Sequence, residues 1–324
     1  MTPKRKEKVT LSDIEIVIPT LNEEEAIGKV LDEIYSVGVK PEQVLVVDGH
    51  STDRTREIAS EKGARVILQE GKGKADAIKT AIKHITRPYM LVMDGDYTYP
   101  ATEIPKLVEK ANESYDEVIG ARLYGRENIP LLHRFGNWII THIFNLFFGT
   151  KLRDVLSGMY LVKLRLVRNL PIESKGFSIE VDIAAKVASI TGKITEVPIY
   201  YRKRIGSKKL KMIHGALIVK DIVKLAWRYN PAFLILVLGA LLFIPGLVIN
   251  SWVLVRLLFY GIKHYVWAII GTLVLSSGVL TLALAVITIY LKRFEYRITH
   301  HILEIRHELD GIVNRLNEEK KGNG

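Results

Sequence analysis

The sequence predicts an α/β domain with a mostly parallel sheet, then two membrane-spanning helices and a C-terminal helix. Three observations lead to this prediction. Over about the first 200 residues, short apolar runs alternate with helical patterns, which is typical of βαβ units. Residues 232–255 and 266–291 carry no charged side chain. Isoleucine and leucine recur at steps of four and three between residues 298 and 316, as in a coiled coil.

The composition is that of a chain whose charged and apolar residues lie in separate regions. The 324 residues are 25% charged and carry a net charge of +11, yet the mean hydropathy is +0.15. The absence of cysteine excludes a disulfide framework and thiolate chemistry. The basic N-terminus lacks an apolar stretch, so we expect no signal peptide. Scarce glutamine beside abundant Lys, Arg and Glu favours a thermophilic, archaeal source.

The elements of the first domain follow in order along the chain. Strands are predicted at residues 14–20, 43–49, 64–69 and 89–96. Helices are predicted at residues 23–38, after residue 53, and at 74–85. Ligands of such sheets bind outside the carboxyl ends of the strands. Polar residues gather at these ends beside Pro19, and they are Thr20, Asn22, Glu23, Asp48, Gln69, Asp94 and Asp96.

Asp94 and Asp96 are separated only by Gly95, at the end of an apolar run. Two carboxylates this close repel each other, and a divalent cation removes the repulsion. Mg²⁺ or Mn²⁺ suits such a pair, and Mg²⁺ typically adds substrate phosphates to one or two carboxylates. The alternative is a turn with solvated acids. It is weakened by Asp48 and by the glycine loop around Lys74 on the same rim, so the pair predicts a diphosphate ligand.

The two uncharged runs are each long enough to cross a bilayer. The alternative, buried helices of a large soluble protein, fits poorly with two such runs joined by a short basic linker. Aromatic residues lie near their ends, as interfacial belts require, namely Trp252, Tyr265, Trp267 and Tyr290. Positive charge concentrates before the first run and after the second. The prediction is a two-span membrane protein with its catalytic domain and both termini in the cytoplasm.

Two stretches read as interfacial helices, with ordinary domain helices as the alternative. Residues 129–152 repeat apolar side chains at helical steps, and residues 208–229 pair a lysine face with an apolar face. The predicted organisation is therefore a catalytic domain at 1–207, a juxtamembrane helix at 208–229, a hairpin at 230–291 and a tail at 292–324. The tail either packs on its own domain or self-associates into a homo-oligomer.

Several motifs resemble those of a known family. The segments "IVIPTLNEEEAI", "VVDGHSTDRT", "GKGKADAI" and "MDGDYTYP" resemble the family-2 glycosyltransferases, which have the Rossmann-like GT-A fold. The segments "GARLYGR", "LRDVLSGMYLV", "KGFSIEVDIAAK" and "TEVPIYYRKRIGSKKL", followed by spans, resemble the polyprenyl-phosphate hexose synthases. Dolichyl-phosphate mannose and glucose synthases belong to that group. The resemblance covers about residues 12–230.

The resemblance implies a nucleotide-sugar site and a metal site. The nucleotide sugar would contact Pro19, Thr20, Asn22, Glu23, Asp48, Gln69, Lys74, Asp94, Gly95 and Asp96. Asp48 would bond the nucleobase, Lys74 would neutralise the diphosphate, and Gly95 would let the sugar approach the backbone. Mg²⁺ or Mn²⁺ would bind Asp94 and Asp96, with Thr98 as a further candidate ligand. Where the family writes "DDGSTD", this chain has Gly49 and His50 in "DGHSTD".

The acceptor implied by the resemblance is a lipid phosphate, largely dianionic at neutral pH and already nucleophilic. Residues expected to bind it are Arg122, Arg134, Ser157, Arg202, Arg204 and Lys208. Residues expected to act in catalysis are Asp94, Asp96, Arg122, Arg202 and Arg204. For each arginine the alternative is a surface charge. Glu180 and Asp182 fall near an acceptor-side acid of the relatives, and an ordinary helix acid is the alternative.

The predicted function is inverting transfer of a hexose from GDP-mannose or UDP-glucose to polyprenyl (dolichyl) phosphate. Transfer of GlcNAc or another sugar, or a catalytically silent nucleotide-sugar binder, are the alternatives. A processive polysaccharide synthase would need a Q-x-x-R-W motif and more spans, and neither Gln43 nor Gln69 fits that motif. Basic residues concentrate beside the spans, which disfavours a nucleic-acid partner.

Overall fold

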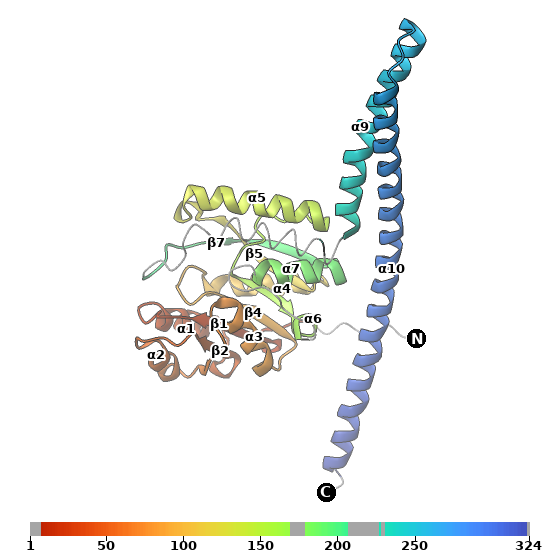
Figure 1. The fold of residues 1–324 in the computed structure, drawn as a ribbon. Helices are drawn as coiled ribbons and strands as arrows, with labels where there is room; N and C mark the ends of the chain where they lie inside the picture. Colours follow the sequence, from red (N-terminus) through yellow and green to blue (C-terminus); the bar gives the residue numbers. More distant parts are fainter. Residues whose placement is uncertain (1–7, 169–178, 207–226, 228–230, 323–324) are drawn as a thin grey trace. The chain divides into compact units, whose positions relative to one another are not determined.

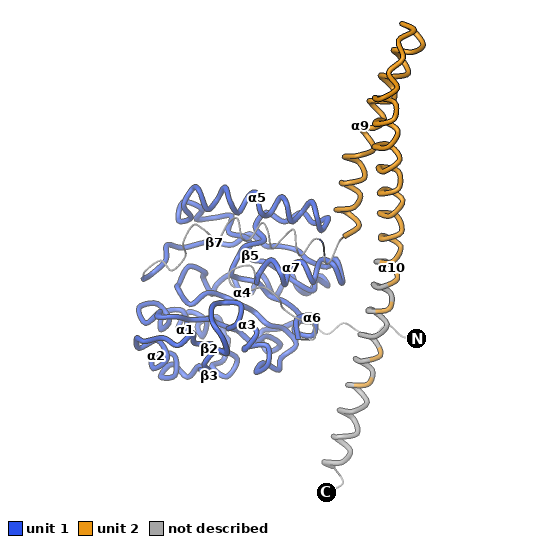
Figure 2. The backbone as a smooth tube through the Cα atoms, viewed as in Figure 1, with its two compact units in different colours: residues 1–229 blue, residues 230–324 orange. Residues whose placement is uncertain are grey.

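The computed structural model describes residues 8–168, 179–206, 227 and 231–322. It divides into two compact units, residues 1–229 and 230–324 (Figure 2). The predicted juxtamembrane helix at 208–229, apart from Trp227, lies outside the described residues, as does Lys208. The two units are therefore described separately.

A seven-stranded sheet forms the centre of the first unit, in the order β3-β2-β1-β4-β6-β5-β7 (Figure 1). The strands are β1 (Ile14–Thr20), β2 (Val44–Asp48), β3 (Arg65–Leu68), β4 (Tyr89–Val92), β5 (Glu117–Tyr124), β6 (Tyr160–Lys163) and β7 (Ile194–Tyr200). Only β6 runs antiparallel to both of its neighbours. The prediction of a mostly parallel α/β sheet is confirmed, and the fold is GT-A.

Helices cover both faces of this sheet. They are α1 (Ile27–Ser36), α2 (Thr55–Glu61), α3 (Lys74–His84), α4 (Ile104–Ala111), α5 (Leu131–Phe148), α6 (Leu164–Arg168) and α7 (Ile179–Ile190). Short 3-10 turns precede or connect them, namely η1 (Leu11–Asp13), η2 (Pro41–Gln43), η3 (Ala101–Glu103) and η4 (Arg126–Asn128). The helices predicted from apolar periodicity at 23–38 and 74–85 correspond to α1 and α3.

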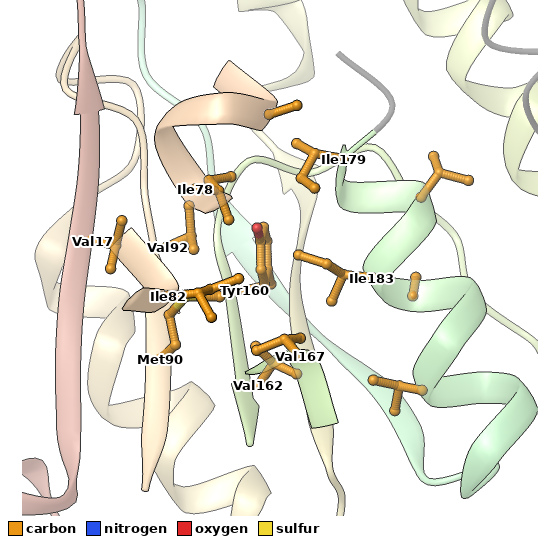
Figure 3. Close-up of a cluster of buried hydrophobic side chains, with 14 of the residues drawn as sticks. Val17, Ile78, Ile82, Met90, Val92, Tyr160, Val162, Val167, Ile179 and Ile183 are labelled. Atoms are coloured by element: carbon orange, nitrogen blue, oxygen red, sulfur yellow. The ribbon is translucent and has the colours of Figure 1, made fainter. Parts of the chain in front are cut away.

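The core lies in two layers because successive side chains of a strand point to opposite faces. Val17 of β1 faces α3 and α7, whereas Ile16 and Ile18 pack on the other face with α1 and α4. Each fully buried isoleucine of this kind contributes about 1.5–3 kcal/mol. In Figure 3, Ile78 and Ile183 lie on either side of the Tyr160 ring. Packing on both faces holds the carboxyl ends of β1, β2 and β4 side by side.

One buried acid of the sheet is expected to make stability depend on pH. Glu117 is 1% exposed, and its Oε2 has no hydrogen-bond partner among the described residues. Burial raises the pKa of Glu117 well above its usual value. The folded state therefore keeps this proton to a higher pH than the unfolded chain. Stability is fully present below the unfolded pKa and falls as pH rises towards the folded pKa, by about 1.4 kcal/mol per unit of pKa difference.

Glu117→Gln removes this titration and nearly preserves the shape of the side chain. We expect its denaturant-unfolding free energy to lose less with rising pH than that of the wild type. The exposed Glu113 supplies the matched control, because Glu113→Gln should follow the wild-type curve. Parallel curves for Glu117→Gln and the wild type would show that Glu117 does not titrate differently on folding.

The second unit consists of α9 (Pro231–Tyr260) and α10 (Tyr265–Gly322). Pro231–Tyr260 and Tyr265–Leu291 are long and apolar enough, by length and composition, to cross a membrane. Pro245 lies inside α9 without ending it. The tail predicted at 292–324 continues the second apolar segment, so both belong to one helix that ends at Gly322.

Glycines let α9 and α10 approach closely in antiparallel register. A Cβ atom added at Gly246 would lie 2.5 Å from the backbone nitrogen of Leu275. One added at Gly239 would lie 2.8 Å from a methyl group of Leu282. Small residues at helix contacts are a common device of membrane helices, because close approach increases van der Waals packing.

Candidate functional site

A partly buried lysine engages the first acid of the pair. Asp94 follows β4, and Lys74 begins α3 after the turn at Gly73. Lys74 Nζ lies 2.6 Å from Asp94 Oδ1 and 2.6 Å from Glu180 Oε1 of α7. Burial by itself would lower the pKa of Lys74, but the two carboxylates outweigh it and raise that pKa well above its usual value. Lys74 is therefore a permanent cation beside Asp94.

An arginine from the segment after β7 engages the second acid. Arg204 Nη1 lies 3.0 Å from Asp96 Oδ2, and its Nη2 lies 2.5 Å from Glu23 Oε1. Thr98 donates from its hydroxyl to Asp96 Oδ1 at 2.5 Å and from its backbone N–H at 3.1 Å. Burial and the neighbouring Asp94 raise the pKa of Asp96, against the opposing effects of Thr98 and Arg204. The acid pair is thus electrostatically strained despite its two cations.

The donor set fits a divalent cation that is shared with a substrate. Among the described residues, no group of three or more His, Cys, Asp or Glu side chains would hold a metal alone. Two carboxylates completed by substrate phosphates are a usual arrangement for Mg²⁺. Gly158 leaves room at the second oxygen of Asp94, since a Cβ there would lie 2.5 Å from Oδ2. Burial and the neighbouring Asp94 raise the pKa of Asp96 because both disfavour its charged form. A bound cation would favour the charged form.

Asp48 is fully buried at the end of β2. Its Oδ2 accepts a 2.7 Å hydrogen bond from the backbone N–H of Ser51, and its Oδ1 a 3.5 Å bond from the hydroxyl of Thr20. These bonds hold the turn after β2 against the end of β1. Asp48 thus fixes the shape of this rim, and its contact with a nucleobase stays a prediction.

The β1 turn is tied to the loop before α2. The backbone N–H of Asn22 donates to Ser51 Oγ at 2.8 Å, and Glu23 N–H donates to Thr55 Oγ1 at 2.7 Å. His50 has φ +64°, a left-handed conformation that glycine adopts readily. The glycine of the family motif "DDGSTD" is therefore replaced here by a histidine that keeps the left-handed backbone conformation. Gln69 donates from Nε2 to the carbonyl of Gly71 at 3.0 Å.

Gly95 packs closely against β1. A Cβ atom added there would lie 2.9 Å from Thr20 Cγ2 and 3.3 Å from Ile18 Cγ2. The missing side chain lets the acid-bearing segment pack against β1. Internal packing is therefore one reason for this glycine, and the approach of a sugar to its backbone stays a prediction. Pro19, also predicted at the site, lies in β1 opposite Val47 of β2.

Arg122 of β5 is held in a fixed orientation. Asp154 accepts hydrogen bonds from its Nε at 2.7 Å, its Nη2 at 2.8 Å and its backbone N–H at 3.1 Å. With its amide correctly oriented, Asn137 of α5 accepts from Nη2 at 3.1 Å. The Nη1 edge of the guanidinium has no partner among the described residues. Arg134, one turn before Asn137, has a buried Nε with no partner among these residues.

The segment after β7 that carries Arg202 and Arg204 packs beside the acid pair. Arg202 forms a bidentate pair with Glu33 of α1, at 2.7 and 2.8 Å. Its guanidinium carbon lies 4.7 Å from the ring centroid of Tyr97. The backbone N–H of Ile205 donates to the carbonyl of Asp96 at 3.2 Å. This segment therefore packs on the turn that carries the acid pair, and Arg202 forms an internal ion pair with Glu33.

Ser157, predicted at the lipid phosphate, is 1% exposed and donates to the carbonyl of Gly120 at 2.5 Å. Its hydroxyl thus orders the connection between β5 and β6. The structure also identifies contacts that motif reading did not assign, namely Glu33, Asn137, Asp154 and the Lys74–Glu180 pair. Asp154 lies inside the quoted motif "LRDVLSGMYLV", but its partner Arg122 is remote in sequence, so only the fold reveals the pair.

Tyr99 and Tyr201 connect the acid pair with Arg122. Their rings meet edge to face at 5.3 Å, and Arg122 lies 5.5 Å from the Tyr201 ring centroid. Burial raises the pKa of both phenols, while Arg122 acts in the opposite direction and Asp94 adds to the rise. Both tyrosines therefore lie within electrostatic range of Asp94 and of Arg122. The acid pair and Arg122 belong to one site.

Comparison with known proteins identifies relatives of this chain. The family model for glycosyl transferase family 2 matches residues 15–169. Glycosyltransferase AglJ of Haloferax volcanii is 35% identical over 279 residues, covering 84% of this chain and 91% of that protein. Dolichyl-phosphate hexose transferase of the same organism is 38% identical over 218 residues, covering 66% of this chain and 94% of that protein.

Solved structures support the same fold. Glucosyl-3-phosphoglycerate synthase from Mycobacterium tuberculosis, in complex with Mn²⁺, UDP and glucosyl-3-phosphoglycerate, superposes with a TM-score of 0.53 at 22% identity. The match covers 67% of this chain and 79% of that chain. The sequence relatives, the family model and the acid pair at the carboxyl edge of the sheet agree. This chain belongs to glycosyltransferase family 2.

Proposed function

We propose that the chain transfers a hexose from a nucleotide sugar to polyprenyl (dolichyl) phosphate at the cytosolic face of the membrane. The observation that carries the proposal is that cationic side chains lie on two sides of one site, with Lys74 and Arg204 beside the acid pair and Arg122 beside Tyr201. Asp94 and Asp96, flanked by Lys74 and Arg204, would bind the metal and the donor diphosphate. The open Nη1 edge of Arg122 and the unpartnered Nε of Arg134 would bind the acceptor phosphate. The name of the 38% identical relative, dolichyl-phosphate hexose transferase, supports the same acceptor.

The chain's residues then have separable tasks. A bound Mg²⁺ or Mn²⁺ on Asp94 and Asp96 would neutralise charge on the departing nucleoside diphosphate. Lys74, whose pKa is raised, stays protonated and keeps a positive charge beside the same diphosphate. Arg122 offers an oriented guanidinium edge to the lipid phosphate. A phosphate monoester dianion needs little help from a general base, because its second pKa is near 6.

Attack by this phosphate on the anomeric carbon, from the face opposite the leaving group, would invert the configuration. A donor with an α-linked sugar would then give a β-linked lipid-phosphate sugar. NMR of the purified product tests this step through the anomeric coupling constant. Retained configuration would exclude a single direct displacement.

Helix α5 supplies the proposed membrane contact of the first unit. One side of it is exposed and mainly apolar, with exposures of 74% at Leu131, 60% at Phe135, 55% at Trp138 and 63% at Leu146. The amide oxygen of Asn137, on the same helix, accepts a hydrogen bond from Arg122 Nη2. An interfacial helix would therefore hold the acceptor arginine at the depth of the lipid headgroups, as residues 129–152 were predicted to do. Both termini are proposed to be cytoplasmic.

A donor panel tests the function. The full chain in detergent or nanodiscs is incubated with a polyprenyl phosphate, Mn²⁺ or Mg²⁺, and GDP-mannose, UDP-glucose or UDP-GlcNAc in turn. We expect an organic-phase product that carries the sugar, with one hexose donor preferred and chelation abolishing turnover. Preference for UDP-GlcNAc would show that the transferred sugar is GlcNAc and not mannose or glucose. Failure with all donors despite binding of a nucleotide sugar would favour the silent binder.

Replacement of Asp154 by asparagine tests the acceptor half of the site. Asp154→Asn keeps the shape but removes the charge that orients Arg122, so we expect the KM for polyprenyl phosphate to rise about tenfold, or about 1.4 kcal/mol. The KM for the nucleotide sugar should change little. Glu196→Gln, which alters the neighbouring pair with Arg153, serves as the control. An equal rise in both KM values would contradict a specific acceptor role for Arg122.

A further inference from the structure

Among the described residues of the second unit, no helix lies opposite the last part of α10. Gly239 opposes Leu282, and Gly246 opposes Leu275, in a constant antiparallel register. The same register places Pro231, where α9 begins, opposite about residue 290. The helix continues to Gly322. Residues 292–322 of α10, hereafter the tail helix, therefore extend beyond the reach of α9.

The described side chains of the tail helix include large apolar groups that are exposed to solvent. Ile298 is 44% exposed, Ile305 is 57% exposed and Leu309 is 55% exposed. In the sequence they belong to a repeat with steps of 4, 3, 4, 3 and 4, formed by Ile298, Ile302, Ile305, Leu309, Ile312 and Leu316. Six such positions in the sequence of one helix predict an apolar seam. Water is a poor partner for this seam, so a protein surface is expected to cover it.

We propose that the seam joins copies of this chain into a parallel, four-stranded coiled coil. The direction follows from the apolar segments of α9 and α10, if they span the membrane as proposed. Copies inserted in the same orientation send their tail helices away from the membrane on the same side, so the helices run parallel. The occupant of the seam is thus the same seam of a second, third and fourth copy.

The residue at each heptad position argues for more than two strands, and we assign four. The steps place Ile298, Ile305 and Ile312 at d, and Ile302, Leu309 and Leu316 at a. Parallel dimers favour β-branched residues at a and leucine at d. Leucine at a with isoleucine at d, or isoleucine at both, favours trimers and tetramers. Two of the three a positions here are leucine and all three d positions are isoleucine, which is the reverse of the dimer pattern.

Stoichiometry is tested on the full chain in mild detergent, by mass from light scattering and by native mass spectrometry. We expect a mass of four chains. The matched variant exchanges the two residue types, with Ile298→Leu, Ile305→Leu, Ile312→Leu, Leu309→Ile and Leu316→Ile. It conserves volume and apolarity, so the helix should persist while the mass falls to two chains. A wild-type monomer, with the seam then packed on the chain's own first unit, would overturn the proposal. A dimer or trimer would overturn the four-stranded assignment.

Direction is tested by crosslinking in native membranes. The chain has no cysteine, so one introduced thiol reports on itself alone. Ile305→Cys should form a disulfide with residue 305 of a neighbouring copy under mild oxidation, which requires parallel strands in register. Tyr296→Cys falls at the outward b position of the heptad and is the control that should not crosslink. Equal crosslinking of the two variants, or none at 305, would overturn the parallel seam. Neither readout depends on catalysis, so failure here and failure of the proposed transfer reaction are distinguishable.

Discussion

Asp96→Asn is expected to abolish most turnover while the protein still folds. The amide keeps the shape of the side chain, and its oxygen still accepts from Thr98, as Asp96 Oδ1 does at 2.5 Å. It removes one of the two charges that would bind the metal. We expect kcat to fall at least about 100-fold, which corresponds to about 2.7 kcal/mol of transition-state stabilisation. The measurement is the initial rate at saturating donor and acceptor with Mn²⁺.

A second readout separates lost metal binding from lost folding. Because a ligand that binds only the folded state raises its stability, Mn²⁺ should raise the Tm of the wild type and leave that of Asp96→Asn unchanged. Asp32→Asn, at an exposed surface pair with Lys62, is the control that should behave as wild type. Near-normal activity of Asp96→Asn would refute the metal assignment.

The metal-dependent rise in Tm should also depend on pH. Burial and Asp94 raise the pKa of Asp96 in the absence of a cation, so protons compete with the metal at a higher pH than at an ordinary aspartate. The stabilisation by Mn²⁺ should therefore be present above this raised pKa and decline as pH falls through it. A shift in Tm that stays constant from neutral to acidic pH would contradict this assignment.

Lys74→Met is expected to have the largest effect on stability. It leaves Asp94 and the 6% exposed Glu180 without their shared cation. Breaking a buried ion pair by removing one partner typically costs about 3–5 kcal/mol, and the lower end of this range is expected here because the side chains of Lys74 and Asp94 are 14% and 30% exposed. Urea unfolding should show a loss of this size at neutral pH. The loss of unfolding free energy should shrink as pH falls, because protonation removes the charge of the two carboxylates that no longer have a cation beside them.

Two further variants make the Lys74 result specific. Lys62→Met removes a more exposed pair, in which Lys62 Nζ lies 2.6 Å from Asp32, and should cost no more than about 1 kcal/mol. Adding Glu180→Gln to Lys74→Met should recover part of the lost stability, because one stranded charge disappears. Equal losses for Lys62→Met and Lys74→Met, or no recovery in the double variant, would show that the buried triad is not the cause.

Much of the fold was predictable because its signals are local. Apolar runs, turn residues and helical periodicity indicated β1 to β4, α1 and α3, and long uncharged runs indicated α9 and the first part of α10. The prediction placed a boundary at residue 291, between the second apolar segment and the tail. The structure has one helix there, since no Gly or Pro interrupts the chain between Gly278 and Gly311 and helical propensity carries across the change in polarity.

By itself, the sequence determined the class of the protein: a family-2 motif series, an acid pair after an apolar strand, two uncharged runs and a heptad tail. These features are readable because each depends on neighbouring residues. Only the tertiary structure decided which charges pair, because ion pairs such as Arg122–Asp154, Arg202–Glu33 and Lys74–Glu180 join residues that are remote in sequence. It also decided that Gly95 serves packing against β1 and that Thr98 bonds Asp96. Burial gives these contacts their strength, and burial belongs to the folded chain as a whole.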